Sequence, residues 1–446
     1  MTPLHRTLAS LWLAACGQAF AANLVAGPMV GATDMHGSTI WLQADAPARV
    51  EIEFWPLEDR EAPRVRTVST LDAANDHAAQ VRLDNLLAGT RYAYRLRLDG
   101  QPAGQIQYFR TQTRWQWKTN VEPPSFTALM GSCNYVNEAA RDRDGPPFGA
   151  DFGIFAAMAE KKPDLMLWLG DNSYLREDEW TSAEGMRYRW RADRSQPELQ
   201  PLLRTGQHAA IWDDHDYGPD DSNSAFELKQ VSLDLFKRYW ANASYGLPGV
   251  PGVFGSFSYS DVDFFLTDNR WYRDADKDQA RKDKRMFGEQ QMRWLKNAIL
   301  MSTAPLKVIV GGSQFLTPVS IRTEGWSHFP AERQEFFDWL TTNKVDGVMF
   351  LSGDRHFTEL TKLDRPGSYP LHDLTCSPLT AGAFNGGADS TRPDRVPGTM
   401  VPQRNFCSFT VDGPKQQRTI TLKAYDTKGQ ELWARKLEAQ ALRTPR

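Results

Sequence analysis

The chain has 446 residues, and its 52 lysines and arginines nearly balance 55 aspartates and glutamates, for a formal net charge of −3. This balance argues against a nucleic-acid-binding surface or a polybasic membrane surface, and no apolar run is long enough to span a bilayer. The length allows one large or two medium domains, and 41% apolar residues with 15 tryptophans can fill a large core.

Residues 1–21 have the pattern of an export signal, in which a histidine and an arginine precede a short apolar stretch. Residues 19–21 read Ala-Phe-Ala, which is typical of a cleavage site, while the residues before Cys16 resemble a bacterial lipobox. The early position of Cys16 favours plain cleavage after Ala21; an ordinary buried helix is a further alternative. We therefore expect a periplasmic or secreted protein, with lipid anchoring to the outer membrane through Cys16 as the alternative.

Residues 22–114 are predicted to form a small β-sandwich domain of their own. Residues 38–43, 50–54 and 92–98 alternate between apolar and polar with a period of two, and turn residues separate them. Residues 83–92 resemble the strand and tyrosine turn of fibronectin type III-like domains. This region contains no group of residues with catalytic chemistry.

Beyond a linker at residues 112–124, strand-like runs alternate with helical ones. This alternation predicts a layered α/β domain over residues 115–446, with helices on the faces of a sheet. The expected strands are residues 125–130, 164–169, 209–212, 262–267, 307–310 and 347–351, with closing strands in 406–411 and 419–437. The expected helices are residues 152–161, 288–300 and 331–341, and one that carries Val231, Leu235, Phe236 and Tyr239 on one face.

Four of these strand-like runs end in side chains of types that commonly bind metal ions in proteins. The ends carry, in chain order, Cys133; Asp171 and Tyr174; Asp214 and His215; and Asp354 and His356. Strand ends in an α/β fold can converge on one edge of a sheet. Each motif alone is weak evidence, because a lone buried cysteine is usually a small apolar residue and a Gly-Asp is usually a turn. The four motifs together indicate a site.

The third motif begins an acidic run with five carboxylates in nine residues, 213–221. A solvated acidic loop is the ordinary explanation of such a run, but bound cations would relieve the repulsion. Carboxylates suit hard cations, while imidazole, phenolate and thiolate favour a transition metal. So many ligand types indicate two or more metal ions, as in binuclear phosphoesterases, and Asp171 could bridge them.

The motifs Gly-Ser-Cys, Gly-Asp-x-x-Tyr, Asp-Asp-His-Asp and Gly-Asp-x-His, in this order, resemble those of the alkaline phosphatase D (PhoD-like) metallophosphatases. The resemblance extends over about residues 23–440, and residues 267–273, 288–295, 311–314 and 374–380 support it. It implies a calcineurin-like metallophosphatase domain after the sandwich. The metal chemistry of this family resembles that of purple acid phosphatases.

The resemblance implies a ligand set for Fe³⁺ and Ca²⁺. Fe³⁺ would be held by Cys133, Asp171, Tyr174 and Asp354. Ca²⁺ would be bridged by Asp171 and held by Asp214, with His356 close to both ions. Some relatives have asparagine where this chain has Asp220, so Asp220 would be a ligand that adds a negative charge.

The same resemblance implies hydrolysis of phosphomonoesters or phosphodiesters, in small molecules or polymers, by a metal-activated hydroxide. Asp171 and His215 would be the catalytic residues, with His215 protonating the leaving group. The candidates for contact with the phosphate are Ser132, Asn134, Arg176 and Arg355, with a solvated side chain as the alternative that we favour for both arginines. Phosphodiester hydrolysis on surface polymers or phospholipid headgroups is an alternative. A non-catalytic envelope protein that binds phosphorylated glycans is another.

Three cysteines remain after removal of the export signal, so one thiol must be unpaired. We expect a disulfide between Cys376 and Cys407 and a free Cys133. Residues 377–400 are rich in glycine and proline. They resemble a mobile active-site lid, and an ordinary surface loop is the alternative.

Overall fold

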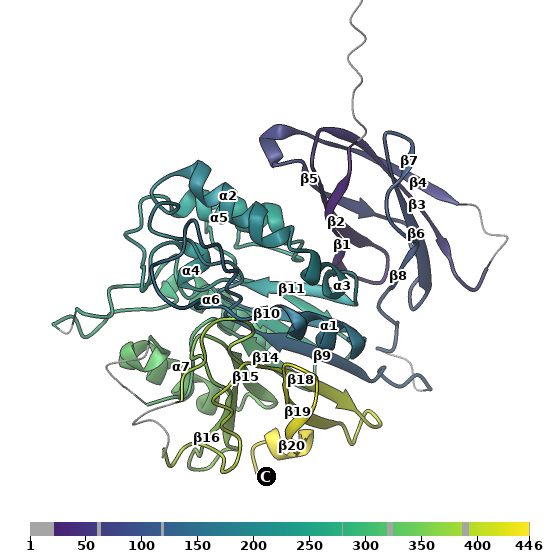
Figure 1. Ribbon diagram of the computed structural model, residues 1–446. Helices are drawn as coiled ribbons and strands as arrows, with labels where there is room; N and C mark the ends of the chain where they lie inside the picture. The colour runs from purple at the N-terminus through teal and green to yellow at the C-terminus, as the bar shows by residue number, and fades with distance from the viewer. Residues whose placement is uncertain are drawn as a thin grey trace, which may run out of the picture.

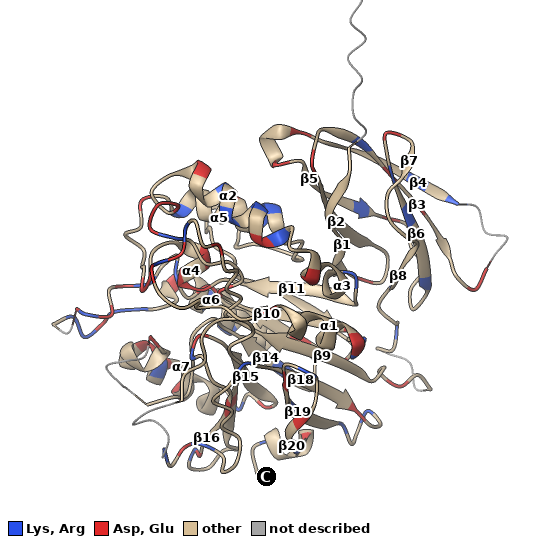
Figure 2. Ribbon diagram, in the orientation of Figure 1, with Lys and Arg blue, Asp and Glu red and all other residues tan. Residues whose placement is uncertain are grey.

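A computed structural model describes residues 22–59, 64–116, 120–278, 280–318, 324–385 and 392–445 (Figure 1). The predicted export signal and Cys16 lie outside these ranges. Among the residues described, no helix combines the length and apolar character that a membrane crossing needs. Lys and Arg are interspersed with Asp and Glu along the helices and loops (Figure 2).

The larger of two central sheets has nine strands. They are β1 (Leu24–Thr33), β2 (Ser38–Ala44), β5 (Ala78–Leu83), β9 (Phe126–Gly131), β10 (Leu165–Leu169), β11 (Gln207–Ile211), β18 (Asn405–Asp412), β19 (Thr419–Asp426) and β20 (Glu431–Glu438). Their spatial order is β20-β19-β18-β9-β10-β11-β1-β2-β5. The strands β9, β10 and β11 are parallel neighbours, so their carboxyl ends lie at one edge.

The second central sheet has six strands. They are β12 (Gly255–Tyr259), β13 (Val262–Leu266), β14 (Leu306–Val310), β15 (Val348–Ser352), β16 (Glu359–Leu363) and β17 (Leu371–Thr375). The order is β12-β13-β14-β15-β17-β16, with β12 and β16 antiparallel to their neighbours at the two edges. The inner faces of the two sheets meet, because Phe264 of β13 packs against Phe126 of β9 and Phe409 of β18.

Helices cover the outer faces of both sheets. They are α1 (Gly153–Glu160), α2 (Ala183–Arg194), α3 (Gln200–Leu203), α4 (Asp214–Tyr217), α5 (Lys229–Tyr239), α6 (Gly288–Met301) and α7 (Pro330–Thr342); short 3₁₀ turns are η1 (Ala73–Asn75), η2 (Pro197–Leu199), η3 (Trp326–His328) and η5 (Ala439–Leu442). Apolar residues of α1, α2, α3 and α5 pack on the nine-stranded sheet. The apolar stripe of α6, formed by Met292, Leu295 and Ile299, packs with α7 on the six-stranded sheet. The predicted layered architecture is confirmed, with two sheets instead of one.

The N-terminal β-sandwich is also present. Its second face is the sheet of β3 (Ala48–Pro56), β4 (Val65–Leu71), β6 (Arg91–Leu98) and β7 (Gln101–Pro102), with β8 (Gln107–Arg110) paired to β6. Its apolar core includes Ile40, Leu42, Val50, Ile52 and Leu96. The period-two alternation therefore located these strands correctly.

The sandwich shares a sheet with the α/β region. Strand β1 pairs in parallel with β11, with Val30 opposite Gln207, so the β1-β2-β5 face continues the nine-stranded sheet. The Trp41 indole nitrogen donates a hydrogen bond to the Arg238 carbonyl at 2.9 Å. The linker is thus not the only connection between the two regions. A period-two pattern identifies a strand but not its partner, which explains why the sequence did not reveal this pairing.

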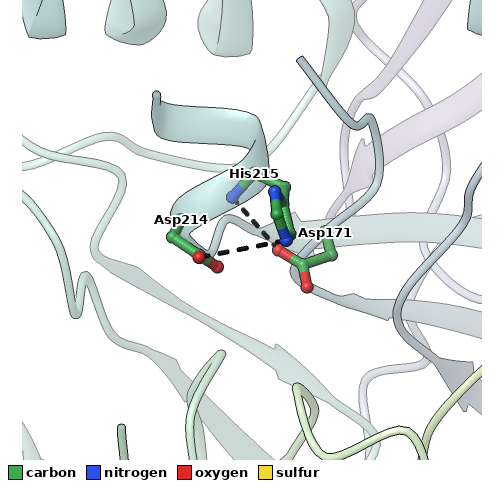
Figure 3. Close-up of side chains that lie close together, drawn as sticks. All are labelled: Asp171, Asp214 and His215. Carbon is green, nitrogen blue, oxygen red and sulfur yellow. Dashed lines mark hydrogen bonds and ion pairs between the residues drawn. The ribbon is translucent and has the colours of Figure 1, made fainter. Parts of the chain in front are cut away.

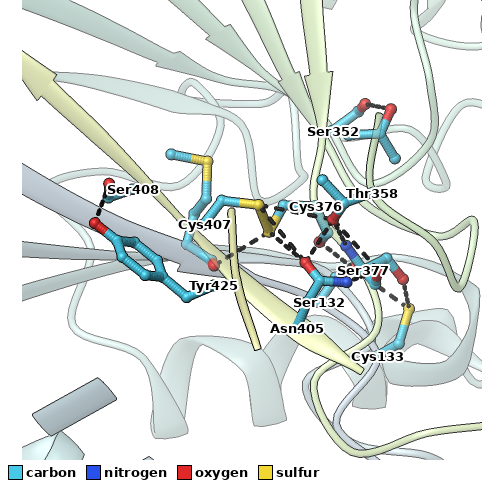
Figure 4. Close-up of a disulfide and its surroundings, with 12 residues drawn as sticks. Ser132, Cys133, Ser352, Thr358, Cys376, Ser377, Asn405, Cys407, Ser408 and Tyr425 are labelled. Carbon is cyan, nitrogen blue, oxygen red and sulfur yellow. Dashed lines mark hydrogen bonds between the residues drawn. A yellow bond between two sulfur atoms is a disulfide. The ribbon is translucent and has the colours of Figure 1, made fainter. Parts of the chain in front are cut away.

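The predicted disulfide between Cys376 and Cys407 is confirmed, and Cys133 is the free, buried cysteine (Figure 4). Cys376 directly follows β17 and Cys407 lies in β18, so the bond crosslinks the two central sheets. Its surroundings reach the Cys133 loop, because the Ser132 hydroxyl donates to the Cys376 carbonyl at 3.1 Å.

Removing this crosslink is expected to destabilise the fold without changing its topology. The bond closes a loop with a sequence separation of 31. Loss of the corresponding loop-closure constraint in the Cys376→Ala/Cys407→Ala variant should lower the free energy of unfolding by about 3–4 kcal/mol, measured by urea titration. The control is Ser408→Ala, which changes the neighbouring position of β18. A loss below about 1 kcal/mol would show that sheet packing alone holds this junction.

Candidate metal centre

The loops that follow β9, β10, β11 and β15 come together at one end of the two central sheets. The Cys133 amide donates to the Gly170 carbonyl at 3.4 Å, and the His215 amide donates to Oδ1 of Asp171 at 3.3 Å. Sγ of Cys133 lies 3.7 Å from the Asp354 carbonyl, which joins the loop after β15 to the loop after β9. Three loops come from the nine-stranded sheet and the fourth from the six-stranded sheet. The expected convergence therefore occurs, but between the edges of two facing sheets and not along the edge of one.

The backbone in these loops is held in an unusual conformation. Cys133, Asp171, Asp354 and His356 have φ angles of 61°, 50°, 74° and 56°, in the left-handed region that non-glycine residues rarely adopt. Such strain persists where the surroundings over-determine the conformation, and it is common at functional sites. Gly170 is required by close packing, because a Cβ there would lie 2.8 Å from Cβ of Asp213.

One half of the centre combines a thiol, a phenol and a carboxylate. The Cys133 thiol lies 3.5 Å from Oδ2 of Asp171, and the Tyr174 hydroxyl donates to the same oxygen at 3.3 Å. The Ser377 hydroxyl donates to Sγ of Cys133 at 3.1 Å. Nε2 of His356 lies 3.2 Å from the Tyr174 hydroxyl. Three of the four predicted iron ligands, Cys133, Asp171 and Tyr174, therefore lie next to one another, and their binding of iron stays a prediction.

The other half contains Asp171, Asp214 and His215, each with a ligand atom within 4.8 Å of the others (Figure 3). The one-turn helix α4 starts at Asp214, so its side chain and that of His215 enter the same site. Nε2 of His215 lies 4.0 Å from Oδ2 of Asp214, and the His215 ring stacks on Tyr174 at 4.1 Å between centroids. The carboxylate of Asp171 lies between the two halves, as a bridging ligand requires.

A second carboxylate group surrounds Asp214, and the sequence did not single out two of its members. Asp214, Asp221 and Glu324 also bring ligand atoms within 4.8 Å of one another. Asp221 was visible only as part of the acidic run, and Glu324 had no sequence signal at all. The side chain of Asp220 is 75% exposed, with Oδ1 at 3.6 Å from Nε2 of His215. A ligand role for Asp220 stays a prediction.

Two further carboxylates of the acidic run have structural roles, because they accept hydrogen bonds from neighbouring loops. Asp216 accepts hydrogen bonds from the amides of Asn172 and Ser173 at 2.9 and 3.1 Å, which fixes the loop that carries Asp171. Asp213 accepts from Nε of Arg270 at 2.5 Å. Both aspartates are fully buried. The run is therefore neither a solvated loop nor a set of five equivalent ligands.

Burial and mutual repulsion dominate the electrostatics of the centre. Burial, followed by repulsion from Asp214 and Cys133, holds the pKa of Asp171 well above its usual range. Burial raises the pKa of the Cys133 thiol to about 12. Burial, reinforced by Asp213 and Asp214, raises the pKa of Asp354 to about 7.

Asp214 is the exception among these groups. Burial opposes its ionisation, but electrostatic attraction from His215 and Arg270 and a hydrogen bond from the Asp221 amide hold the pKa of Asp214 below the usual range. Oδ2 of Asp354 is buried and accepts no hydrogen bond from the described residues. Orphaned lone pairs and crowded carboxylates both fit multivalent cations, and the thiol and phenol fit a transition metal.

The two predicted phosphate contacts, Asn134 and Arg355, flank the centre. Asn134 is 3% exposed; its amide donates to the Asn172 carbonyl at 3.2 Å and accepts from the Thr380 hydroxyl at 3.2 Å. The Arg355 guanidinium lies over the Phe357 ring, 5.3 Å from its centroid. Substrate contact by either residue stays a prediction.

The predicted lid is only partly described. Its first residues are buried and form a wall of the centre, because Ser377 contacts Cys133 and the Gly382 carbonyl lies 2.6 Å from Nδ1 of His356. This start of the segment is therefore not an ordinary surface loop. Residues 386–391 lie outside the described ranges.

A cavity of about 550 Å³ opens beside the centre. Tyr174, His215 and Asp220 line it on the side of the centre. Phe148 and Trp180 contribute to its other walls. Its volume suits a small-molecule substrate. Side chains of types that bind metal ions therefore lie at the wall of an accessible cavity.

Comparison with known proteins agrees with this geometry. The sequence model described as "PhoD-like phosphatase" matches residues 130–416, and a model of a domain of unknown function (DUF7800) matches residues 21–112. Alkaline phosphatase D of Bacillus subtilis (strain 168) is 24% identical over 329 residues, covering 63% of this chain. The match spans only 53% of that relative's length.

Two solved structures share the fold. A structure of PhoD superposes with a TM-score of 0.74 at 17% identity, covering 92% of this chain and 91% of the other. The purple acid phosphatase PPD1 from yellow lupin superposes with a TM-score of 0.65 at 13% identity, covering 92% and 74%. The metallophosphatase fold expected from the sequence is thus confirmed.

Proposed function

Because the chain belongs to the PhoD-like phosphatase family, we propose that it is an exported, metal-dependent phosphoesterase acting on phosphomonoesters, phosphodiesters or both. One observation carries this proposal. A buried thiol, phenol, two imidazoles and several carboxylates meet at the wall of a cavity large enough for a small phosphate ester. A glycan-binding envelope protein would not need this donor set.

We assign the iron site to Cys133, Asp171, Tyr174 and Asp354, with His356 next to it. Calcium would be held by Asp171 and Asp214, with Asp220 as predicted or with Asp221 and Glu324, which share the Asp214 cluster. When bound, such ions lower the pKa of water and offset charge on phosphoryl oxygens.

The side chains then have separate tasks. Asp171 holds the two halves of the centre together through both of its oxygens. His215 lines the cavity and is placed to protonate the leaving oxygen. Asn134 and Arg355 would orient the phosphate.

Residues 1–21 would direct export, and a mature protein starting at residue 22 would support cleavage over lipidation at Cys16.

The metal assignment predicts a coloured protein. A phenolate from Tyr174 bound to Fe³⁺ should give a visible charge-transfer band, and elemental analysis should find iron and calcium. The Tyr174→Phe variant should lose the band while keeping its unfolding midpoint, whereas Tyr108→Phe, in β8 of the sandwich, should keep both. Colourless, fully active protein containing only zinc would refute the iron assignment.

A hydrolysis assay separates enzyme from binding protein. Protein loaded with iron and calcium should hydrolyse p-nitrophenyl phosphate or bis-p-nitrophenyl phosphate at alkaline pH, and removal of metals by a chelator should abolish this activity. Loaded, folded protein without activity on either ester would contradict the proposed function.

A further inference from the structure

The cavity beside His215 has an aromatic wall, of which the proposed metal centre accounts only for Tyr174. Tyr135, Phe148, Tyr174 and Trp180 all line it. Tyr135 packs edge-on against Phe148 at 5.0 Å and against Tyr174 at 5.1 Å between ring centroids. Apolar walls with a few polar groups are typical of sites that bind a ligand's carbon skeleton.

Phe148 is the outermost part of this wall. Its side chain is 44% exposed although it is large and apolar. Its ring centroid lies 5.8 Å from that of His356 and 6.4 Å from that of Tyr174. A Cβ on Gly382 would come within 2.9 Å of the Phe148 ring, so the glycine lets the ring lie against the loop that contacts His356. Phe148 therefore extends the wall from the metal centre to the cavity mouth.

The charged groups of the cavity are not arranged to bind an additional anion. The guanidinium of Arg176 pairs with Asp142 at 2.9 Å, and Nε of Arg143 donates to Glu177 at 2.6 Å. Arg176 also donates to the carbonyls of Val136 and Tyr174. Both arginines are thus engaged by carboxylates, and Asp144 and Asp220 add further negative charge to the lining.

We propose that this cavity binds the alcohol part of the phosphate ester and selects apolar leaving groups without negative charge, with Phe148 as the specificity-determining residue. The inference rests on the proposed function, because it places the leaving oxygen beside His215. A leaving group that extends from His215 into the cavity passes along Tyr174 and then Phe148. Its apolar part is removed from water there, while a carboxylate or second phosphate would meet Asp144 and Asp220.

The test compares two esters of similar chemical reactivity. Ethyl phosphate and 2-phenylethyl phosphate release similar alkoxides as leaving groups, but only the second leaving group has a ring that can lie against Phe148. Phe148→Ala should lower kcat/KM about tenfold for 2-phenylethyl phosphate and less than about twofold for ethyl phosphate. The visible absorption band should not change. Tyr108→Ala, which removes an exposed aromatic ring 53% accessible in β8, should affect neither ester.

A second variant tests whether the cavity discriminates against negatively charged leaving groups. Asp144→Lys should raise kcat/KM for 2-phosphoglycolate relative to ethyl phosphate by about threefold. An unchanged ratio would overturn the selection by charge. Equal losses in Phe148→Ala on ethyl phosphate and 2-phenylethyl phosphate, whose alcohol parts are both uncharged, would overturn the aromatic subsite. If the metal-loaded parent protein hydrolyses neither these esters nor the two nitrophenyl esters, the proposed function fails and the inference fails with it. Activity on a nitrophenyl ester without activity on any of these esters overturns the inference and leaves the proposed function standing. Activity on ethyl phosphate with no preference for the phenyl ester overturns the inference alone.

Discussion

Asp171→Asn is expected to lower kcat/KM at least about a thousandfold for every phosphate ester, with loss of bound metal. The reason is the central position of this carboxylate. One oxygen faces the Cys133 thiol and the Tyr174 hydroxyl, and the other accepts from the His215 amide at 3.3 Å. An amide of the same shape keeps the packing but removes the negative charge that would hold two cations together.

Kinetics, elemental analysis and thermal unfolding check this prediction together. Asp338→Asn, on the exposed face of α7, is the matched control and should behave like the parent protein. Since burial and repulsion raise the pKa of Asp171, the metal-free form of Asp171→Asn should be at least as stable as the metal-free parent at neutral pH. A variant that keeps its metals and more than about a tenth of its activity would exclude a bridging role.

His215→Ala should reduce hydrolysis in a way that depends on the leaving group. A nitrophenolate leaves without a proton, whereas an alkoxide needs one, and general acid catalysis typically contributes about a hundred- to ten-thousand-fold. His215 is 22% exposed at the cavity, and its Nε2 lies 3.6 Å from Asp220. We therefore expect a loss of about a hundredfold or more for ethyl phosphate and much less for p-nitrophenyl phosphate.

The same variant distinguishes a general acid from a metal ligand. His215 shares the 4.8 Å cluster with Asp171 and Asp214, so direct coordination is the competing explanation. Metal content and the visible band should be unchanged if His215 is the acid. Equal losses on both esters, or loss of calcium or iron, would assign it to coordination or phosphate positioning. His36→Ala in the sandwich provides the histidine control, since His36 contacts the Leu86 carbonyl far from the cavity.

The sequence by itself determined the components of the site and their order along the chain. Each apolar run that ends at Cys133, Asp171 or Asp214 became a parallel strand, because a buried strand and the loop at its end are encoded by neighbouring residues. Residue types alone also indicated a mixed metal centre, since thiol, phenol, imidazole and carboxylate favour different ions. Counting cysteines in an exported chain predicted one unpaired thiol, and the expected pairing of Cys376 with Cys407 is present in the structure.

Only the tertiary structure decided how these components meet. It placed the Asp354 loop on a second sheet, joined β1 to β11, and brought Glu324 next to Asp214. It also divided the acidic run, in which Asp216 holds a loop while Asp214 enters the centre. Local periodicity encodes which face of an element is buried but not which distant element covers that face. Contacts between residues far apart in sequence depend on how the strands and sheets pack, and the cavity beside His215 forms where the loops after β9, β10 and β11 meet.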